Sequence, residues 1–128
     1  MANVRTVYRC RLCGQVVEVL TPGAGELVCC GEPMQELTGL TADGAAEKHL
    51  PVAEAAEGGV RIKVGSEPHP MRPEHWIDWI EVVTADSVWR RELAPGDEPA
   101  AFFPLGMADL RMVRIHCNLH GLWRLELA

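Results

Sequence analysis

Four cysteines crowded into the first 30 residues are the feature that most constrains how this chain can fold. They form two close pairs: Cys10 and Cys13, with two residues between them, and Cys29 and Cys30, in direct succession. The segment around them is too short to bury enough apolar surface by itself, so it needs a metal ion, disulfides or a partner chain. Two pairs at this spacing are typical of a site where four thiolates hold one iron or zinc ion.

The spacing does not choose between iron and zinc, so a zinc ribbon with a purely structural ion remains an alternative. Residues 7–37 otherwise show a metal-ribbon pattern, with a β-prone run at 16–19 and a Pro-Gly turn at 22–25. The pair Cys29 and Cys30 is unusual, because a strand sends successive side chains to opposite faces. We therefore expect a distorted site.

Charge and hydropathy limit the classes of partner. The net charge is −6, and no run of Lys and Arg offers a track for a phosphate backbone, so we expect no nucleic-acid partner. No stretch has the ~20 apolar residues of a membrane span, and residues 1–20 lack the apolar run of a secretion signal. We expect a soluble cytoplasmic protein, in which five cysteines act as metal ligands before they form disulfides.

The remainder of the chain predicts an all-β sandwich. From about residue 50 onward, short strand-like runs are separated by Gly and Pro turns, and no long helical period is present. Strands are expected at 60–64, 76–84, 88–93, 112–117 and 122–127, after a linker at 39–46. On the strand 112–117 the alternation turns Cys117 inward and predicts that His116 points to water.

Four of the five histidines lie in segments suited to present ligands: His49, His69, His75 and His120. Prolines on both sides of His69 restrict its loop. Cys117 and His120 stand three residues apart across a tight turn, so both can meet at one ion. Several imidazoles with one thiolate favour a redox metal. Blue copper remains a competitor on this pattern, although its usual site takes two histidines rather than four.

Residues 8–14 and 26–34 resemble desulforedoxin and the N-terminal domain of desulfoferrodoxins, in which the ion is iron. Residues 47–49, 65–71 and 117–121 are similar to the signatures of superoxide reductases, and the resemblance covers nearly the whole chain. It implies a desulforedoxin-like iron-tetrathiolate domain at 1–38 and a catalytic domain at 39–128 with an immunoglobulin-like antiparallel β-sandwich.

The resemblance also implies two irons per chain. Cys10, Cys13, Cys29 and Cys30 would hold the first. Four equatorial histidines and an axial cysteine would hold the second: His49, His69, His75, His120 and Cys117. The implied activity is the one-electron reduction of superoxide to hydrogen peroxide, for superoxide detoxification, with rubredoxin or a similar electron donor and a homodimeric assembly.

Two charged residues next to His49 receive roles from the resemblance. Lys48 would steer superoxide and organise protons, and Glu47 would be a carboxylate that moves onto ferric iron after the product has left. Because the protein is acidic overall, a local positive charge near the open position is needed to attract an anion.

Other readings stay open on the residues alone. The chain can be a non-catalytic iron electron-transfer protein, or a zinc-ribbon module whose histidines are incidental. The tryptophans at positions 76, 79, 89 and 123 are expected in the core rather than as shields of a metal. The apolar stretch 100–108 predicts no function.

Overall fold

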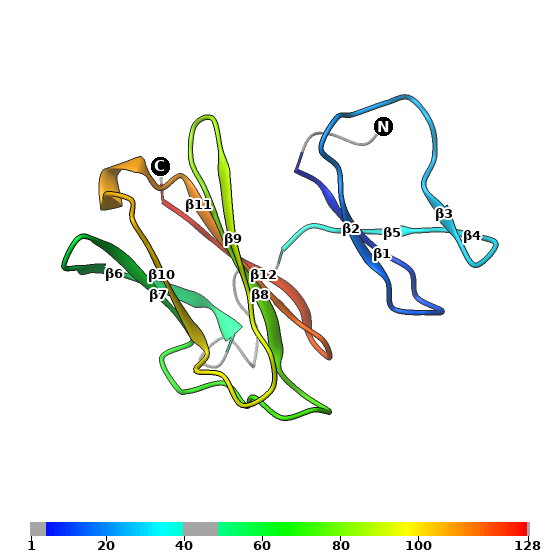
Figure 1. The fold of residues 1–128 in the computed structure, drawn as a ribbon. Helices are drawn as coiled ribbons and strands as arrows, with labels where there is room; N and C mark the ends of the chain where they lie inside the picture. Colours follow the sequence, from blue (N-terminus) through cyan, green and yellow to red (C-terminus); the bar gives the residue numbers. More distant parts are fainter. Residues whose placement is uncertain (1–4, 40–48, 128) are drawn as a thin grey trace. The chain divides into compact units, whose positions relative to one another are not determined.

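The structure is a computed structural model, and it describes residues 5–39 and 49–127. The chain divides into two compact units, Met1–Thr38 and Gly39–Ala128. Both units are built from antiparallel β-strands (Figure 1), which confirms the predicted all-β class. Most of the predicted linker, residues 40–46, lies outside the described residues, as do Glu47 and Lys48. Within the described ranges no helix has the length and hydropathy of a membrane span.

The first unit carries two small sheets. One has the order β2-β1-β5 and the other pairs β3 with β4. The strands are β1 (Val7–Arg9), β2 (Val16–Glu18), β3 (Val28–Cys29), β4 (Glu32–Pro33) and β5 (Gln35–Leu37). Among the described residues of this unit, only Val7 and Cys10 are buried. So little buried apolar surface cannot offset the entropy of ordering the unit, which agrees with a fold that depends on a metal.

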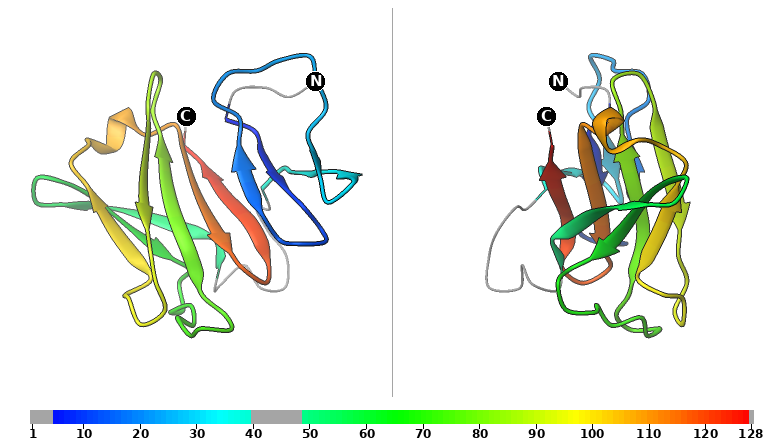
Figure 2. Two further views of the ribbon diagram at one scale, coloured as in Figure 1. Left: turned by 45° about the vertical axis from the view of Figure 1, so that its right-hand side comes forward. Right: turned by 90° about the vertical axis from the view of Figure 1, so that its left-hand side faces the viewer.

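The second unit consists of two β-sheets, which Figure 2 shows from two further directions. One sheet has the order β10-β7-β6 and the other β12-β11-β8-β9. The strands are β6 (Pro51–Ala56), β7 (Gly59–Val64), β8 (Ile77–Val83), β9 (Val88–Glu92), β10 (Ala100–Phe103), β11 (Met112–Cys117) and β12 (Gly121–Glu126), with a short 3-10 helix η1 (Met107–Asp109) before β11.

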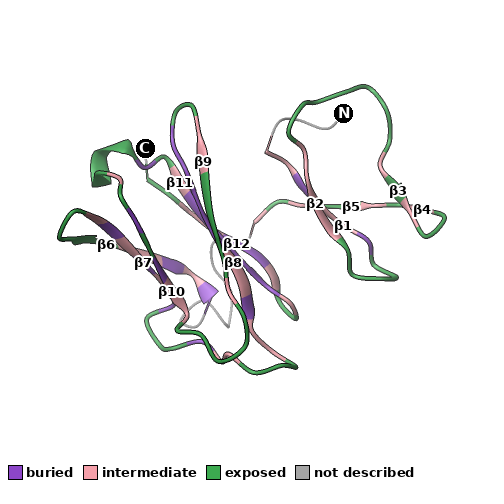
Figure 3. Ribbon diagram, viewed as in Figure 1, coloured by how far each residue is buried: buried purple, intermediate pink, exposed green. Residues whose placement is uncertain are grey.

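The core of the second unit is formed by side chains from both sheets. On β7, Val60, Ile62 and Val64 are buried while the residues between them are half-buried, as the alternation predicts. On β11, Ile115 and Cys117 enter the same cluster. In Figure 3 the buried positions lie along strands of both sheets, and many of the connecting turns are exposed. The core therefore anchors the strand that ends in Cys117.

His116 does not point to water, which corrects the sequence-based expectation. It is 2% exposed, its Nδ1 lies 2.8 Å from Asp78 Oδ1, and its ring stacks on Trp79 at 5.6 Å. The pairing of β11 with β8 shifts here, because His116 lies opposite Trp79 whereas Cys117 lies opposite Ile77. The bulge leaves Asp78 as an extra residue beside His116. The alternation of side chains along β11 correctly placed His116 on the face opposite Cys117. It could not show that this face is buried.

Part of the segment 100–108 is a strand of the second unit. Residues 100–103 form β10, an edge strand that the sequence did not predict, with Ala101 and Phe103 in the core. β6 was also missed as a strand. Of the four tryptophans expected in the core, Trp123 is fully buried, whereas Trp89 on the edge strand β9 is 39% exposed. Edge strands bury only one side well, so residue type alone overestimates burial there.

Candidate metal centres

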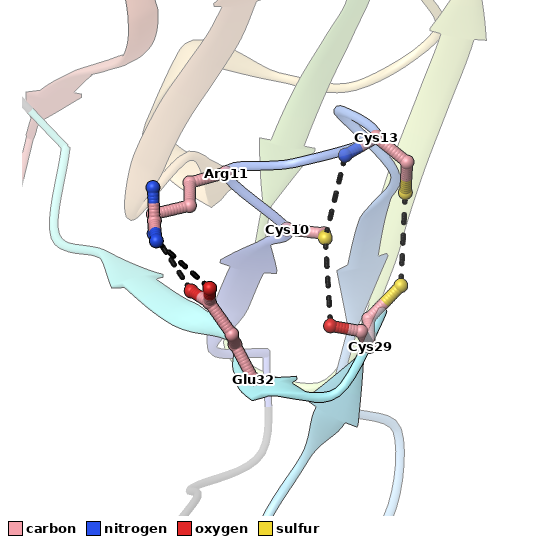
Figure 4. A network of polar contacts seen from close by, with 5 residues as sticks. All are labelled: Cys10, Arg11, Cys13, Cys29 and Glu32. Carbon is pink, nitrogen blue, oxygen red and sulfur yellow. Dashed lines mark hydrogen bonds and ion pairs between the residues drawn. The ribbon is translucent and has the colours of Figure 1, made fainter.

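The four N-terminal cysteines lie on two tight turns, and Figure 4 shows Cys10 and Cys13 of the first turn close to Cys29 of the second. Cys10 directly follows β1, and Gly14, at φ +83°, donates its N–H to the Cys10 carbonyl at 2.9 Å. Cys30 and Gly31 form the two-residue loop of the β3–β4 hairpin with φ of +55° and +79°. Two positive φ values are typical of a type I′ turn. The left-handed backbone of Cys30 is what lets two successive cysteines face the same point.

The sulfur positions fit a tetrahedral ion. Cys13 Sγ lies 3.6 Å from Cys29 Sγ, which lies 3.9 Å from Cys30 Sγ, and all four sulfurs are within 4.8 Å of one another. Four sulfurs at about 2.3 Å from one tetrahedral ion are about 3.8 Å apart. This donor set suits iron or zinc.

The acidities of these thiols differ. The backbone N–H of Cys13 lies 3.5 Å from Cys10 Sγ and is the main reason that the pKa of Cys10 is lowered to about 6. Interactions with the Cys10 and Cys13 side chains raise the pKa of Cys29 to about 12. Four thiolates at these distances repel one another, so a cation is required to hold them together.

An ion pair joins the two cysteine turns from outside. Arg11 Nε donates to Glu32 Oε1 at 2.7 Å and Arg11 Nη2 donates to Glu32 Oε2 at 2.8 Å. Arg11 lies between Cys10 and Cys13, and Glu32 follows the second pair, so the contact spans both turns (Figure 4).

The second unit brings together all five residues proposed for the other centre. Each comes from a different place in the fold: His49 precedes β6, His69 follows β7, His75 precedes β8, Cys117 ends β11 and His120 lies in the β11–β12 turn. One donor atom of each residue lies within 4.8 Å of the others. These positions span 72 residues of sequence, so only the tertiary fold places them side by side.

The four imidazoles form a square. Neighbouring ring centroids are 4.7 Å apart for His49 and His69, 4.6 Å for His69 and His75, 5.0 Å for His75 and His120, and 4.7 Å for His120 and His49. His49 and His75 are 6.4 Å apart. A square with 4.7 Å sides has a diagonal of about 6.6 Å. His49 and His75 therefore occupy opposite corners.

The nitrogen distances support ligation at right angles. His49 Nε2 lies 3.1 Å from His69 Nε2 and 3.0 Å from His120 Nδ1. Nitrogens held at about 2.1 Å from one ion are about 3.0 Å apart at right angles and about 3.4 Å apart in a tetrahedron. These two distances match imidazoles that would bind one ion at right angles more closely than a tetrahedral arrangement.

Cys117 would supply the fifth donor. Its Sγ lies 3.6 Å from His120 Nδ1, and the residue is fully buried. Burial raises the pKa of the Cys117 thiol, so its thiolate form needs a nearby cation. Five donors of this kind, four imidazoles and one thiolate, match the preferences of a redox-active first-row metal.

Contacts around the ring fix individual imidazoles. His69 Nδ1–H donates to the Pro70 carbonyl at 2.6 Å, which leaves Nε2 for the centre of the square. Burial lowers the pKa of His69 to about 4, so the ring is neutral as a metal ligand must be. Trp123 stacks on His49 at 4.9 Å with 13° between the planes, so this core tryptophan also covers the site.

Sequence reasoning missed Asn118. Its side chain contacts the segment that carries His75, and the only signal in the sequence was its position between Cys117 and His120. A polar residue in a tight turn is common, so that signal does not stand out.

A tetrathiolate cluster on one small β unit and a His4Cys cluster on an antiparallel β unit define a non-haem metalloprotein with two distinct centres. Comparison with known proteins identifies the class further. Residues 2–37 match the family described as desulfoferrodoxin, N-terminal domain, and residues 41–126 match the desulfoferrodoxin family. The chain belongs to the desulfoferrodoxin family.

Relatives cover the whole length of the chain. A desulfoferrodoxin homolog from Methanothermobacter thermautotrophicus is 53% identical over 96% of this chain and 99% of its own. A desulfoferrodoxin from Syntrophotalea carbinolica is 53% identical over 98% and 99%. The crystal structure of the superoxide reductase from Treponema pallidum superposes with a TM-score of 0.74 at 30% identity, covering 94% of this chain and 96% of that one.

These matches confirm the family resemblance and the fold that it implied. The protein is an enzyme of the superoxide reductase family, and its two clusters correspond to the two irons of desulfoferrodoxins. The zinc-ribbon and blue-copper readings are thereby set aside.

Proposed function

We propose that this protein reduces superoxide by one electron to hydrogen peroxide at the His4Cys centre and serves superoxide detoxification. The observation that supports this most directly is the square of four imidazoles with Cys117 as a fifth donor, in a chain that belongs to the desulfoferrodoxin family. Five protein ligands leave one position of an octahedral ion for a small oxidant.

The proposed ligands of this centre are His49, His69, His75, His120 and Cys117. Iron bound there would supply the electron, and the Cys117 thiolate would donate electron density to it, as axial thiolates do in haem enzymes. The protein holds the imidazoles neutral and in place, through the Pro70 carbonyl at His69 and the Trp123 ring at His49. A rigid ligand set of this kind keeps the sixth position available to substrate.

Glu47 and Lys48 are proposed as catalytic residues. Both precede the proposed ligand His49 in the sequence, Lys48 directly and Glu47 one position earlier. Lys48 would attract the superoxide anion and organise the proton that forms hydrogen peroxide, and Glu47 would bind ferric iron after the product has left. A positive charge is needed locally because the net charge of the chain is −6.

The tetrathiolate centre is proposed to hold iron on Cys10, Cys13, Cys29 and Cys30 and to keep the small N-terminal domain, 1–38, folded. The catalytic domain would be 39–128. We further propose rubredoxin or a similar small protein as the electron donor, a homodimer, and a cytoplasmic location, where free thiols persist.

The test combines metal analysis with the reaction itself. The purified protein is analysed for iron and zinc, its visible spectrum is recorded before and after ascorbate, and the reduced protein is mixed with superoxide. About two irons per chain, and peroxide formed without dioxygen, are expected. Zinc alone, or iron without a reaction toward superoxide, would instead favour a structural or electron-carrying role.

A pair of variants tests the ligand assignment. His75→Gln is expected to lose iron from the His4Cys centre, whereas His116→Gln, which changes the histidine outside the square, is expected to retain both irons. Equal iron content in the two variants would contradict the assignment.

A further inference from the structure

We propose that Asn118 is a positioning residue of the His4Cys centre, which fastens the loop that carries His75 to the turn that carries Cys117 and His120. This inference rests on the ligand set proposed above. It adds a residue that binds neither metal nor substrate but sets where one ligand stands.

Three hydrogen bonds carry the inference. Asn118 Oδ1 accepts the backbone N–H of Trp76 at 2.9 Å, and Asn118 Nδ2 donates to the carbonyl of Glu74 at 3.1 Å. The backbone N–H of Asn118 also donates to the Trp76 carbonyl at 3.2 Å. The bonds fall on both sides of His75, on the residue before it and on the residue after it.

The strands alone do not fix this loop. The pairing of β11 with β8 ends where Cys117 lies opposite Ile77, after the register shift next to His116. Beyond this point the Trp76 N–H donates to the side chain of Asn118 rather than to the backbone of a neighbouring strand. A half-buried backbone group needs such a partner, so the side chain of Asn118 and its backbone N–H together continue the ladder past Cys117.

The His75 loop behaves as a small unit of its own. Arg72 and His75 exchange backbone hydrogen bonds of 3.0 and 2.9 Å, which closes a tight turn around the residues between them. A closed turn moves as one piece, so a clamp on Glu74 and Trp76 sets the position of the His75 ring. That ring stands beside His120 at 5.0 Å and opposite His49 at 6.4 Å.

The chemistry of the clamp requires an amide. The head group must accept from an N–H and donate to a C=O at the same time, and the side chains of Asn and Gln carry both functions on one head. Aspartate keeps the acceptor for Trp76 but loses the donor for Glu74. Alanine loses both, and leaves the Trp76 N–H without its acceptor.

The experiment measures how firmly the centre holds iron. Iron-loaded wild type, Asn118→Ala and Asn118→Asp are mixed with a chelator, and loss of the His4Cys absorption is followed with the tetrathiolate absorption of the same molecule as reference. Removing an outer partner of a metal ligand typically costs ten- to a hundred-fold in affinity, so Asn118→Ala is expected to lose this iron about ten- to a hundred-fold more readily. Asn118→Asp should fall between Ala and wild type.

Asp109→Ala is the matched control. Asp109 Oδ2 accepts the backbone N–H of Gly106 at 3.1 Å, so it makes the same kind of side-chain bond to a loop. It lies in η1 just before the start of β11, whereas Cys117 ends that strand. Asp109→Ala is expected to retain iron like wild type.

A second measurement separates positioning from stability. Asn118→Ala should shift the midpoint potential and the absorption band of the His4Cys centre and leave those of the tetrathiolate centre unchanged. If Asn118→Ala lowers thermal stability but holds iron as Asp109→Ala does and keeps both the potential and the band, the inference is wrong. If Asn118→Ala does not fold, Asn118→Asp decides by the same criteria. A wild-type protein that binds no iron at this centre would contradict the proposed function instead.

Discussion

At the residue scale, Cys30 shows how a metal site tolerates an unfavourable backbone. Its φ of +55° places a non-glycine residue in the left-handed region. That conformation costs about 1–2 kcal/mol. A structural ion held by four protein ligands contributes about 10 kcal/mol or more to folding, so the metal outweighs the strain. The adjacent cysteine pair is therefore compatible with a stable site.

The ion pair of Arg11 and Glu32 leads to a prediction about iron retention. Their side chains are 67% and 38% exposed, so the pair should change the free energy of unfolding by less than about 1 kcal/mol. The two hydrogen bonds of this ion pair tie the two cysteine turns together. We therefore expect Arg11→Ala to release tetrathiolate iron to a chelator several-fold faster than wild type, a factor that corresponds to about 1 kcal/mol.

The control for this prediction is the exposed pair of Lys63 and Glu54, 3.2 Å apart on the other unit. Lys63→Ala should leave tetrathiolate iron release unchanged. A double-mutant cycle of Arg11 and Glu32 isolates the coupling between the two side chains. Additive effects in that cycle would show that the ion pair does not act on the site.

Lys48 leads to a prediction about the rate with superoxide. We expect Lys48→Ala to slow the second-order reaction of the reduced protein about ten-fold and to weaken its dependence on ionic strength, because a local positive charge would no longer attract the anion. Pulse radiolysis at several salt concentrations measures both quantities. An unchanged rate would remove Lys48 from the mechanism, and Lys63→Ala serves as a control for loss of one positive charge.

At the scale of strands, one row of charges runs across the sheet β12-β11-β8-β9. Glu81 on β8 lies opposite Arg114 on β11 and Arg90 on β9. Glu81 Oε1 accepts from Arg114 Nη2 at 2.6 Å, and Glu81 Oε2 accepts from Arg90 Nε at 2.9 Å. Glu81 is 1% exposed and Arg114 4%. This row lies on the face of β11 opposite Cys117, where Asp78 and His116 also pair.

The buried row leads to a prediction about stability. Glu81→Ala removes the carboxylate that both arginines contact, and leaves the Arg114 charge in a buried position. Breaking a buried ion pair in this way costs about 3–5 kcal/mol. Urea denaturation followed by tryptophan fluorescence measures the loss, and Glu81→Gln, which keeps the shape and one acceptor, should cost less.

The comparison for this variant is Glu54→Ala, whose side chain is 46% exposed and contacts Lys63 at the surface. We expect it to change the free energy of unfolding by less than about 1 kcal/mol. A similar small loss in Glu81→Ala would mean that the buried row adds little to the sheet.

At the scale of the whole chain, the two units differ in what holds them together. Residues 1–38 have almost no buried apolar side chains among those described, whereas the second unit has a continuous apolar core. All four tryptophans lie in the second unit, at positions 76, 79, 89 and 123. Tryptophan fluorescence therefore reports the second unit alone.

This contrast predicts two separate responses to metal loss. Cys13→Ser should abolish the tetrathiolate iron and unfold the first unit, because a small domain without its ion lacks the buried surface to stay folded. The tryptophan emission and the His4Cys absorption should remain as in wild type. Amide hydrogen exchange, resolved by residue, measures both units in one sample. Joint unfolding of the two units would contradict this independence.

Much of this architecture could be predicted because it depends on local patterns. Strand alternation predicted the buried faces of β7 and β11, and turn residues predicted where strands end. Strand alternation could not predict β10, because four residues are too few to show a period. It could not predict the burial of His116 either, because that burial depends on the bulge where β11 pairs with β8. Roles for Glu47 and Lys48 came from family resemblance and stay predictions.

The sequence by itself determined which atoms can bind a metal ion. Residue type and short spacing specify thiolates in two close pairs, and imidazoles in restricted loops, because ligand chemistry belongs to individual side chains. Only the tertiary structure decided how they meet: the square with His49 opposite His75 and the clamp by Asn118. These features arise from contacts between segments distant in sequence, and no local pattern contains the geometry of such contacts.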